Sequence, residues 1–356
     1  MDINRLLTDA FTKDASDIHL RVGSRPVYRI NGELVMDDES EIITPETARS
    51  IADLVMGERE RGIFESCRDA DFAYSIPGAG RFRCNIFMQR GTIGLVFRTI
   101  PFGIPDIASL HLPQVISDAA LSERGLVLVT GATGSGKTTT LASMINHINS
   151  SRSLNIVTIE DPIEYLHKDI KSIITQREVG GDTASFNAAL RAALRQDPDV
   201  IFVGEMRDSE TIETAITAAE TGHLVLSTLH TVDATETINR IISSFPTHIQ
   251  HQIRRQLSSV LRAVISQRLL PRADARGRVP AVEVMLATDT VKACILDPEK
   301  TNNLKLLIRE GKNYYNMQTF DQSLYDLHKQ GLITYEEAIR HSTSPKDLEL
   351  RMKGVE

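Results

Sequence analysis

The stretch Gly131-Ala-Thr-Gly-Ser-Gly-Lys137-Thr138 fits the pattern G-x-x-x-x-G-K-[ST] of a phosphate-binding (Walker A) loop. Its surroundings fit as well: the apolar run LVLVT at 126–130 predicts a buried parallel strand, and residues 137–149 favour a helix. In such a loop the glycines let successive backbone N–H groups point into one concavity, which the positive end of the following helix also faces. Lys137 can then reach the β- and γ-phosphates of a nucleotide, and the Thr138 hydroxyl can bind Mg²⁺.

We therefore predict a site for ATP or ADP with Mg²⁺ at this loop. The residues expected to contact the nucleotide are Gly131, Thr133, Gly134, Ser135, Gly136, Lys137, Thr138 and Thr139.

Composition narrows the class of protein. The 356 residues carry a formal net charge of −7 and include 41% hydrophobic residues, enough for ordinary cores and a length that favours two domains. The negative charge argues against a dedicated nucleic-acid binder. Cys67, Cys84 and Cys294 are isolated, so we expect neither disulfides nor a structural zinc site. With no apolar run long enough to span a membrane and no signal-peptide pattern, a cytoplasmic protein is expected.

The two predicted domains meet near residue 105. Residues 1–100 alternate short strand patterns, a predicted hairpin turn at Asn31-Gly32 and two helices, which predicts a small α+β domain. The segment Pro101-Phe-Gly-Ile-Pro105 breaks regular structure, and we assign residues 101–110 to a linker or hinge. From 111 to 356 we predict an α/β domain with strands at 126–130, 155–159, 200–204 and 224–228, helical from about 285.

Acidic residues follow two of these predicted strands. Glu160 and Glu164 lie in the run IEDPIE at 159–164, and Glu205 follows the run VIFVG at 200–204. The carboxyl ends of strands are where α/β folds bind ligands, so these acids are candidates to orient the attacking water or to hold Mg²⁺. The second run has the form of a Walker B strand with Gly204 where an aspartate is often found, which leaves Glu205 as metal partner or base.

Two histidines flank the predicted strand at 224–228. A polar group just past a core strand can sense a γ-phosphate through a hydrogen bond, and His223 and His230 are candidates for this role. Histidines of the core or the surface are the alternative, and spacing alone does not decide between them. Arg83 and Arg98, on predicted strands of the first domain, are candidates to meet the charge that develops on a γ-phosphate.

Several of these segments together resemble the secretion ATPase superfamily, which includes the type II secretion and type IV pilus motors. The run LRAALRQDPDVIFVGEMRDSET at 190–211 is similar to its signature, the run at 159–164 to its Asp box and residues 221–230 to its His box. Residues 15–20, 80–83, 96–98 and 317–321 also match. The resemblance covers almost the whole chain and is closest to the pilus retraction ATPases.

This resemblance implies a PAS-like N-terminal domain, a RecA-like ATPase domain and a ring of six subunits. It implies that Arg83 and Arg98 are arginine fingers, that Glu164 and Glu205 form an acidic catalytic pair, and that His230 monitors the nucleotide. The expected activity is Mg²⁺-dependent ATP hydrolysis that powers pilus retraction and twitching motility. The expected place is the cytoplasmic face of the inner membrane, with a membrane platform protein, and also a paralogous pilus ATPase, as partners.

Retraction, as opposed to assembly, is favoured by the short N-terminal region and the absence of a four-cysteine zinc motif, both unlike assembly ATPases. One departure counts against it, because residues 290–297 lack the retraction motif that is expected there, and a similar run, LLIRE, occurs only at 306–310. A pilus or type II secretion assembly ATPase remains an alternative. Two rivals from other classes are a nucleic-acid translocase and a nucleotide switch that does not hydrolyse ATP.

Overall fold

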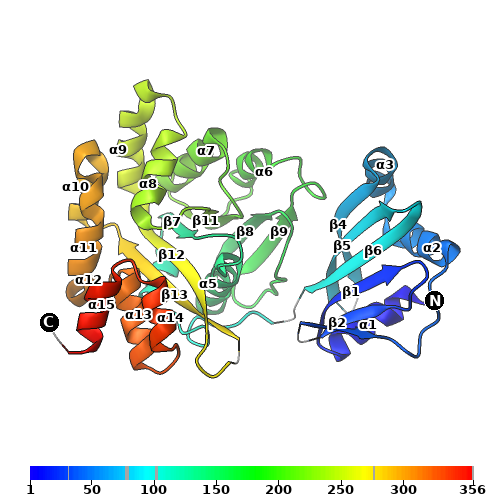
Figure 1. Cartoon of the computed structure of the whole chain (residues 1–356). Coiled ribbons are helices and arrows are strands. Elements are labelled where there is room, and N and C mark those ends of the chain that lie inside the picture. Colours follow the sequence, from blue (N-terminus) through cyan, green and yellow to red (C-terminus); the bar gives the residue numbers. More distant parts are fainter. Residues whose placement is uncertain (31, 77–79, 101–102, 276, 355–356) are drawn as a thin grey trace. The chain divides into compact units, whose positions relative to one another are not determined.

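The computed structural model describes residues 1–30, 32–76, 80–100, 103–275 and 277–354 (Figure 1). The chain divides into two compact units, Met1–Gly103 with Glu164–Leu166 and Ile104–Ile163 with His167–Glu356. Of the predicted linker at 101–110, residues 101 and 102 lie outside the described residues, as does Asn31 of the predicted hairpin turn. No helix among the described residues is long and apolar enough to cross a membrane.

The first unit is an antiparallel sheet with helices against one face. Its strands follow the order β3-β2-β1-β6-β5-β4, with every neighbouring pair antiparallel. Their bounds are β1 (Ala15–Arg21), β2 (Val27–Ile30), β3 (Glu33–Met36), β4 (Asp69–Ile76), β5 (Gly80–Gln89) and β6 (Thr92–Ile100). Its helices are α1 (Ile3–Thr12), α2 (Pro45–Val55) and α3 (Glu58–Cys67).

Alternation of apolar and polar residues along the strands explains this layering. In β5, Phe82, Cys84 and Ile86 are buried against the helices, whereas Arg81 and Arg83 point to the other face. Each large buried side chain contributes about 1.5–3 kcal/mol through the hydrophobic effect. The helix-free face of the sheet therefore carries the polar side chains, including both candidate arginines.

One edge of this sheet is apolar. Strand β3 pairs only with β2 among the described residues, and its three apolar residues Leu34, Val35 and Met36 are each about half exposed. Ile42, shortly after the strand, is exposed as well.

The second unit is a sheet covered by helices on both faces. Its strands follow the order β13-β12-β7-β11-β10-β8-β9, all parallel except β13. Their bounds are β7 (Gly125–Thr130), β8 (Asn155–Glu160), β9 (Ile173–Glu178), β10 (Val200–Val203), β11 (Leu224–Leu229), β12 (Leu261–Pro271) and β13 (Arg278–Leu286).

Strand β7 lies in the interior of this sheet and is buried along its whole length. Leu126 and Leu128 pack into one core with helices α6 to α10, and Val127 and Val129 pack into a second core with α4 and α5. The helices are α4 (Val115–Ala120), α5 (Lys137–Ser151), α6 (Phe186–Ala193), α7 (Ser209–Glu220), α8 (Ala234–Ser243), α9 (Gln250–Val260) and α10 (Asp289–Leu296).

Shorter helices complete the C-terminal part, and Figure 1 shows α13 to α15, coloured orange to red, gathered beside β13. These elements are η1 (Thr247–Ile249), η2 (Pro298–Asn303), α11 (Leu304–Glu310), α12 (Lys312–Tyr315), α13 (Phe320–Lys329), α14 (Tyr335–His341) and α15 (Pro345–Met352). The predicted fold class is confirmed: an α+β N-terminal unit, a parallel-sheet unit built around the phosphate loop, and a helical C-terminal part. The four predicted strands of that unit correspond to β7, β8, β10 and β11, whereas α3, β9, β12 and β13 were missed.

Candidate functional site

The loop at 131–136 joins the carboxyl end of β7 to the first turn of α5. Three of its glycines have left-handed backbones, with φ of 145° at Gly131, 77° at Gly134 and 89° at Gly136. A Cβ at Gly131 would lie 2.4 Å from the carbonyl oxygen of Gln267, and a Cβ at Gly136 would lie 2.7 Å from the side-chain nitrogen of Gln267. Glycine is therefore required at both positions for its conformation and for lack of space.

Lys137 is buried at the start of α5, with 8% of its surface exposed. Its Nζ donates to the carbonyl oxygens of Gly131 at 2.8 Å and of Ala132 at 3.1 Å, so the ammonium group lies over the loop. Ser135 Oγ is buried and has no hydrogen-bond partner among the described residues. A buried cation, an unpaired hydroxyl and the amino end of a long helix suit the phosphates of a nucleotide, and the half-buried Thr138 hydroxyl suits a Mg²⁺ ion bound to them.

The other predicted loop residues differ in exposure. Thr133 and Gly134 are exposed, whereas Thr139 is half buried on α5, where its carbonyl accepts from Ser143 Oγ at 2.8 Å. The outer half of the loop is thus open to solvent, and its inner half is built into the sheet.

Sequence reasoning missed Gln267, a buried residue of β12 that fastens this loop. Its Nε2 donates to the carbonyl oxygen of Ser135 at 2.8 Å, and its Oε1 accepts from Thr140 Oγ1 at 2.8 Å. The preceding Ser266 accepts from Thr130 Oγ1 at 2.9 Å, so β12 holds the chain on both sides of the loop. No local pattern marks Gln267, because 127 residues separate it from Thr140.

Glu205 follows β10 directly and lies close to His230. Its carboxylate accepts from Arg207 Nε at 2.7 Å and lies 3.2 Å from His230 Nε2. The hydrogen bond and the negative charge of Glu205 raise the pKa of Arg207. A Cβ at Gly204 would lie 3.1 Å from the carbonyl oxygen of Ile159, so a larger residue at this position would be tightly packed. The structure thus brings two predicted catalytic residues, Glu205 and His230, close together.

The loop after His230 is anchored to the C-terminal part. Ala234, in the first turn of α8, donates its N–H to Glu283 Oε1 on β13 at 2.9 Å. Asp233, which caps that helix, pairs with Lys305 Nζ of α11 at 3.0 Å. Burial raises the pKa of Glu283 to about 7. The segment that carries His230 is therefore tied to β13 and α11.

The two acids of the run at 159–164 occupy different surroundings. Glu160 ends β8 and is buried, and its Oε1 accepts from Thr158 Oγ1 at 2.6 Å and from Gln176 Nε2 at 3.1 Å. Glu164 is exposed, and the described residues offer it no hydrogen bond or ion pair. Glu160 is thus held in place, whereas Glu164 is free to meet a partner.

His223 lies away from the phosphate loop. It directly precedes β11, and the residue after it, Leu224, pairs with Gly125 at the start of β7, whereas Leu229 pairs with Thr130 beside the loop. Strands of this length span about 20 Å, so His223 lies at the amino ends of the parallel strands and the loop lies at their carboxyl ends. Its Nδ1 lies 2.9 Å from the carbonyl oxygen of Ala218. The structure does not bring His223 to the loop of its own chain.

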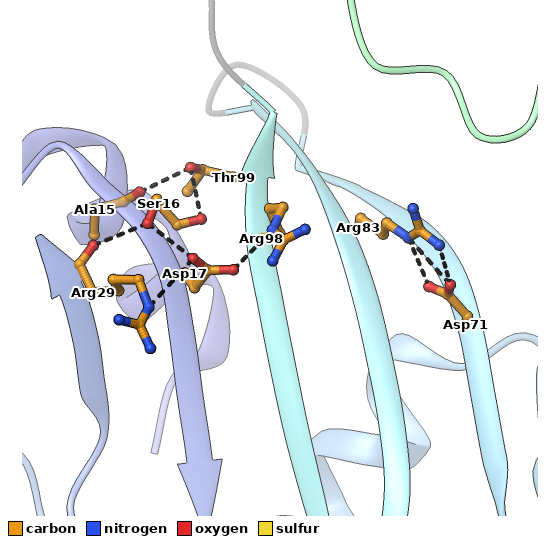
Figure 2. Close-up of polar contacts among 8 residues, drawn as sticks. All are labelled: Ala15, Ser16, Asp17, Arg29, Asp71, Arg83, Arg98 and Thr99. Atoms are coloured by element: carbon orange, nitrogen blue, oxygen red, sulfur yellow. Dashed lines mark hydrogen bonds and ion pairs between the residues drawn. The ribbon is translucent and has the colours of Figure 1, made fainter. Parts of the chain in front are cut away.

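Arg83 and Arg98 lie on the helix-free face of the first unit, directly opposite each other on β5 and β6 (Figure 2). Arg83 Nε donates to both carboxylate oxygens of Asp71 at 3.1 Å. Arg98 Nε donates to Asp17 Oδ1 at 2.9 Å. Both candidate arginines are therefore paired with carboxylates of neighbouring strands.

Comparison with known proteins identifies a family and several proteins that this chain resembles. A model of the type II/IV secretion system protein family matches residues 108–295. Two relatives come from Pseudomonas aeruginosa. The type IV pilus ATPase PilU is 42% identical over 353 residues, which cover 99% of this chain and 92% of PilU. The type IV pilus retraction ATPase PilT is 42% identical over 347 residues, which cover 98% of this chain and 100% of PilT.

A solved structure extends this likeness to three dimensions. The crystal structure of the pilus retraction motor PilT with bound ADP is 47% identical in sequence and superposes with a TM-score of 0.90. The match covers 98% of this chain and 99% of that one. It therefore includes the unit that carries Arg83 and Arg98 as well as the unit that carries the phosphate loop.

Proposed function

The chain belongs to the family of type II/IV secretion system proteins, and from this membership we propose that it is an ATP-hydrolysing motor that retracts type IV pili. The observation that carries the proposal is the match to PilT, which extends over the full length of that retraction ATPase. The phosphate loop with its buried lysine supports the nucleotide-binding part independently of any relative.

In this proposal the loop and Lys137 bind the phosphates of ATP. Lys137 leaves the carbonyl oxygens of Gly131 and Ala132 and turns to the β- and γ-phosphates. The Thr138 hydroxyl, and Glu205 through water, would hold a Mg²⁺ ion, which would supply positive charge beside the phosphates. The loop amides hold the phosphates in line for attack, since most catalysis of phosphoryl transfer is positioning and electrostatic stabilisation.

The remaining residues act on the attacking water and on the γ-phosphate. Glu205 orients the water or accepts its proton, and Glu164, which is exposed and unpaired among the described residues, is the second acid for that role. His230 lies 3.2 Å from Glu205, so it is placed to report on the state of that carboxylate. Arg83 and Arg98 meet the charge that develops on the γ-phosphate.

The assembly and the location are part of the same proposal. Coupling of ATP hydrolysis to movement needs neighbours, and a ring of about six subunits gives each subunit the same two interfaces. We place this ring at the cytoplasmic face of the inner membrane, against a membrane protein of the pilus base. Light scattering with nucleotide tests the ring, and a strict monomer under all conditions would contradict the motor.

A second candidate is a paralogue that works beside a retraction motor, because the chain is as similar to PilU as to PilT, at 42% identity. Deletion of the gene separates the candidates when pilus number and twitching motility are scored. Excess pili with lost motility identify the retraction motor. Normal pilus number with weakened motility identifies the paralogue, and absent pili identify an assembly ATPase, which would overturn the proposal.

A further inference from the structure

The segment that carries His230 leads from the end of β11 into the first turn of α8. Thr231 and Thr237, both buried, share a hydrogen bond of 2.7 Å between their hydroxyl groups. Val232 donates its N–H to Glu236 Oε2 at 3.0 Å. The segment is thus bonded to α8 itself, so a group that holds the first turn of α8 also sets the place of His230.

Two contacts bind this first turn to other elements of the second unit. Glu283 Oε1 on β13 accepts the N–H of Ala234 at 2.9 Å. Lys305 Nζ on α11 lies 3.0 Å from a carboxylate oxygen of Asp233. Helix α8 also packs against β12, β13 and α11 (Figure 1). The contact to β13 is buried, because Glu283 is only 5% exposed, whereas the side chain of Lys305 is 58% exposed.

The position of Glu283 in the sheet connects it with the phosphate loop. Glu283 pairs in register with Ser266 on β12, and Ser266 pairs in register with Thr130, the last residue of β7. Thr130 also pairs in register with Leu229, the residue before His230. A row of paired residues therefore runs across four strands from Glu283, past the start of the loop, to the segment that carries His230.

A carboxyl group at this place is costly for the fold. Burial raises the pKa of Glu283 to about 7, although the bond from Ala234 and the positive charges of Lys305 and Arg268 favour its ionised form. An apolar side chain in the same space would avoid the cost of burying a carboxyl group. Carboxyl groups with strongly shifted pKa values occur preferentially at functional sites. The cost at Glu283 therefore calls for a function of its oxygen atoms.

We propose that Glu283 is a positioning residue of ATP hydrolysis. By fixing the first turn of α8 it keeps His230 beside Glu205, and the pair of Lys305 and Asp233 supports it. The inference rests on the proposed role of Glu205 and His230 in hydrolysis. His230 Nε2 lies 3.2 Å from Glu205 Oε1, but the side chain of His230 is 45% exposed, so the imidazole depends on its backbone for its place.

Two substitutions of Glu283 separate the bond from the shape of the side chain. Glu283→Leu fills a similar space but removes the oxygen that accepts from Ala234. Its kcat should fall by about tenfold or more, because a small displacement of a reacting group can cost about 10²-fold in rate. Glu283→Gln keeps an acceptor oxygen at the same place and should keep most of the activity. The affinity for ADP should stay unchanged in both variants, since the phosphate loop is intact.

A double-substitution cycle links the effect to His230. Both Glu283 variants are also measured in a His230→Ala chain, which has already lost the group that Glu283 is proposed to position. Glu283→Leu should lower kcat no further in that chain, so the two effects should be strongly non-additive. A merely structural role of Glu283 would lower kcat by the same factor in both chains and would weaken ADP binding as well.

The exposed contact gives a second variant that leaves the buried core untouched. Lys305→Ala should lower kcat by about twofold, within the range that an exposed ion pair allows, and should leave ADP affinity unchanged. Lys300→Ala is the matched control. Lys300 pairs with Asp297 at the same distance of 3.0 Å and its side chain is 61% exposed, but this partner lies at the start of η2 and not on α8. Its kcat should equal that of the unchanged chain.

Several outcomes would overturn the inference. It fails if Glu283→Leu folds, as judged by circular dichroism, and keeps a normal kcat, if Glu283→Gln loses as much activity as Glu283→Leu, or if the losses of Glu283→Leu and His230→Ala multiply. Should Glu283→Leu not fold, an equal kcat of Lys305→Ala and Lys300→Ala would overturn it. If His230→Ala hydrolyses ATP normally, the proposed role of His230 fails; if His230→Ala is impaired and only the Glu283 results disagree, this inference alone fails.

Discussion

Lys137 and Arg83 are two cations with the same proposed ligand and very different surroundings. Lys137 is buried and held by carbonyl oxygens of its own loop, whereas Arg83 is half exposed and held by a carboxylate from another strand. The ammonium group of the lysine donates to the carbonyl oxygens of Gly131 and Ala132, which belong to the loop itself. The arginine bonds to Asp71 on a neighbouring strand. The cation of the second unit is thus held by bonds within one loop, and the cation of the first by a bond between neighbouring strands.

The largest expected effect comes from substitution of Lys137, whose ammonium group donates to carbonyl oxygens of its loop. Lys137→Ala should reduce ATP turnover to near background, because the described loop has no second cation that could replace it at the β- and γ-phosphates. A steady-state ATPase assay measures this effect. Near-normal turnover in a folded variant would remove the nucleotide site from this loop.

The next effect separates chemistry from binding within the same unit. Glu205→Gln keeps the shape of the side chain but removes its charge beside Arg207 and His230. Hydrolysis should fall by about 10²–10⁴-fold, as expected for loss of a positioned base, while the affinity for ATP changes little. If hydrolysis stays normal, Glu164 is the base.

A smaller effect tests whether the loop depends on its own backbone alone. Gln267→Ala leaves the Ser135 carbonyl and the Thr140 hydroxyl without their buried partner. Nucleotide affinity should fall by about tenfold, with a loss of stability of about 1–3 kcal/mol. Titration with ADP and thermal unfolding measure the two changes. Gln256→Ala, which removes a surface bond to Glu220, is the control and should change neither.

The last effect is confined to high pH and concerns Glu283, a buried carboxylate that accepts a backbone N–H. Because burial raises the pKa of Glu283 to about 7, the folded chain keeps a proton there that the unfolded chain releases above its ordinary value of 4.5. Stability from this group is therefore complete at low pH and is lost as the pH rises through about 7. Glu283→Gln should remove this dependence, a difference of about 3 kcal/mol between the two chains at high pH.

Urea unfolding of both chains at several pH values measures this difference. A constant gap between the two curves from about pH 5 to about pH 8 would mean that Glu283 is ionised in the folded chain throughout.

The phosphate loop could be predicted from the sequence because its information is local. Gly131 and Gly136 are fixed by backbone angles and by nearby atoms, and Lys137 follows them directly. Contiguous residues with special conformations leave a pattern that one stretch of sequence shows. The strands β7, β8, β10 and β11 were also predicted, because each is a short apolar run that ends in a turn.

The parts that could not be predicted depend on distant pairings. Asp17 and Arg98 are 81 residues apart and meet only because β1 and β6 are neighbours. Gln267 reaches the loop because β12 lies beside β7, and β12 itself was missed because its apolar run is interrupted by Arg262, Ser266 and Gln267. Glutamines and arginines occur mostly on surfaces, so residue type alone predicted no contact for them.

The apolar edge of the first unit affects how this protein can be handled in solution. Strand β3 presents Leu34, Val35 and Met36 at the end of its sheet, and no lysine or proline of the strand interrupts them. Natural sheets use such residues, or a covering segment, to prevent edge-to-edge pairing of chains. The first unit prepared alone should therefore self-associate more readily than the second, and its solubility will depend on whatever covers β3.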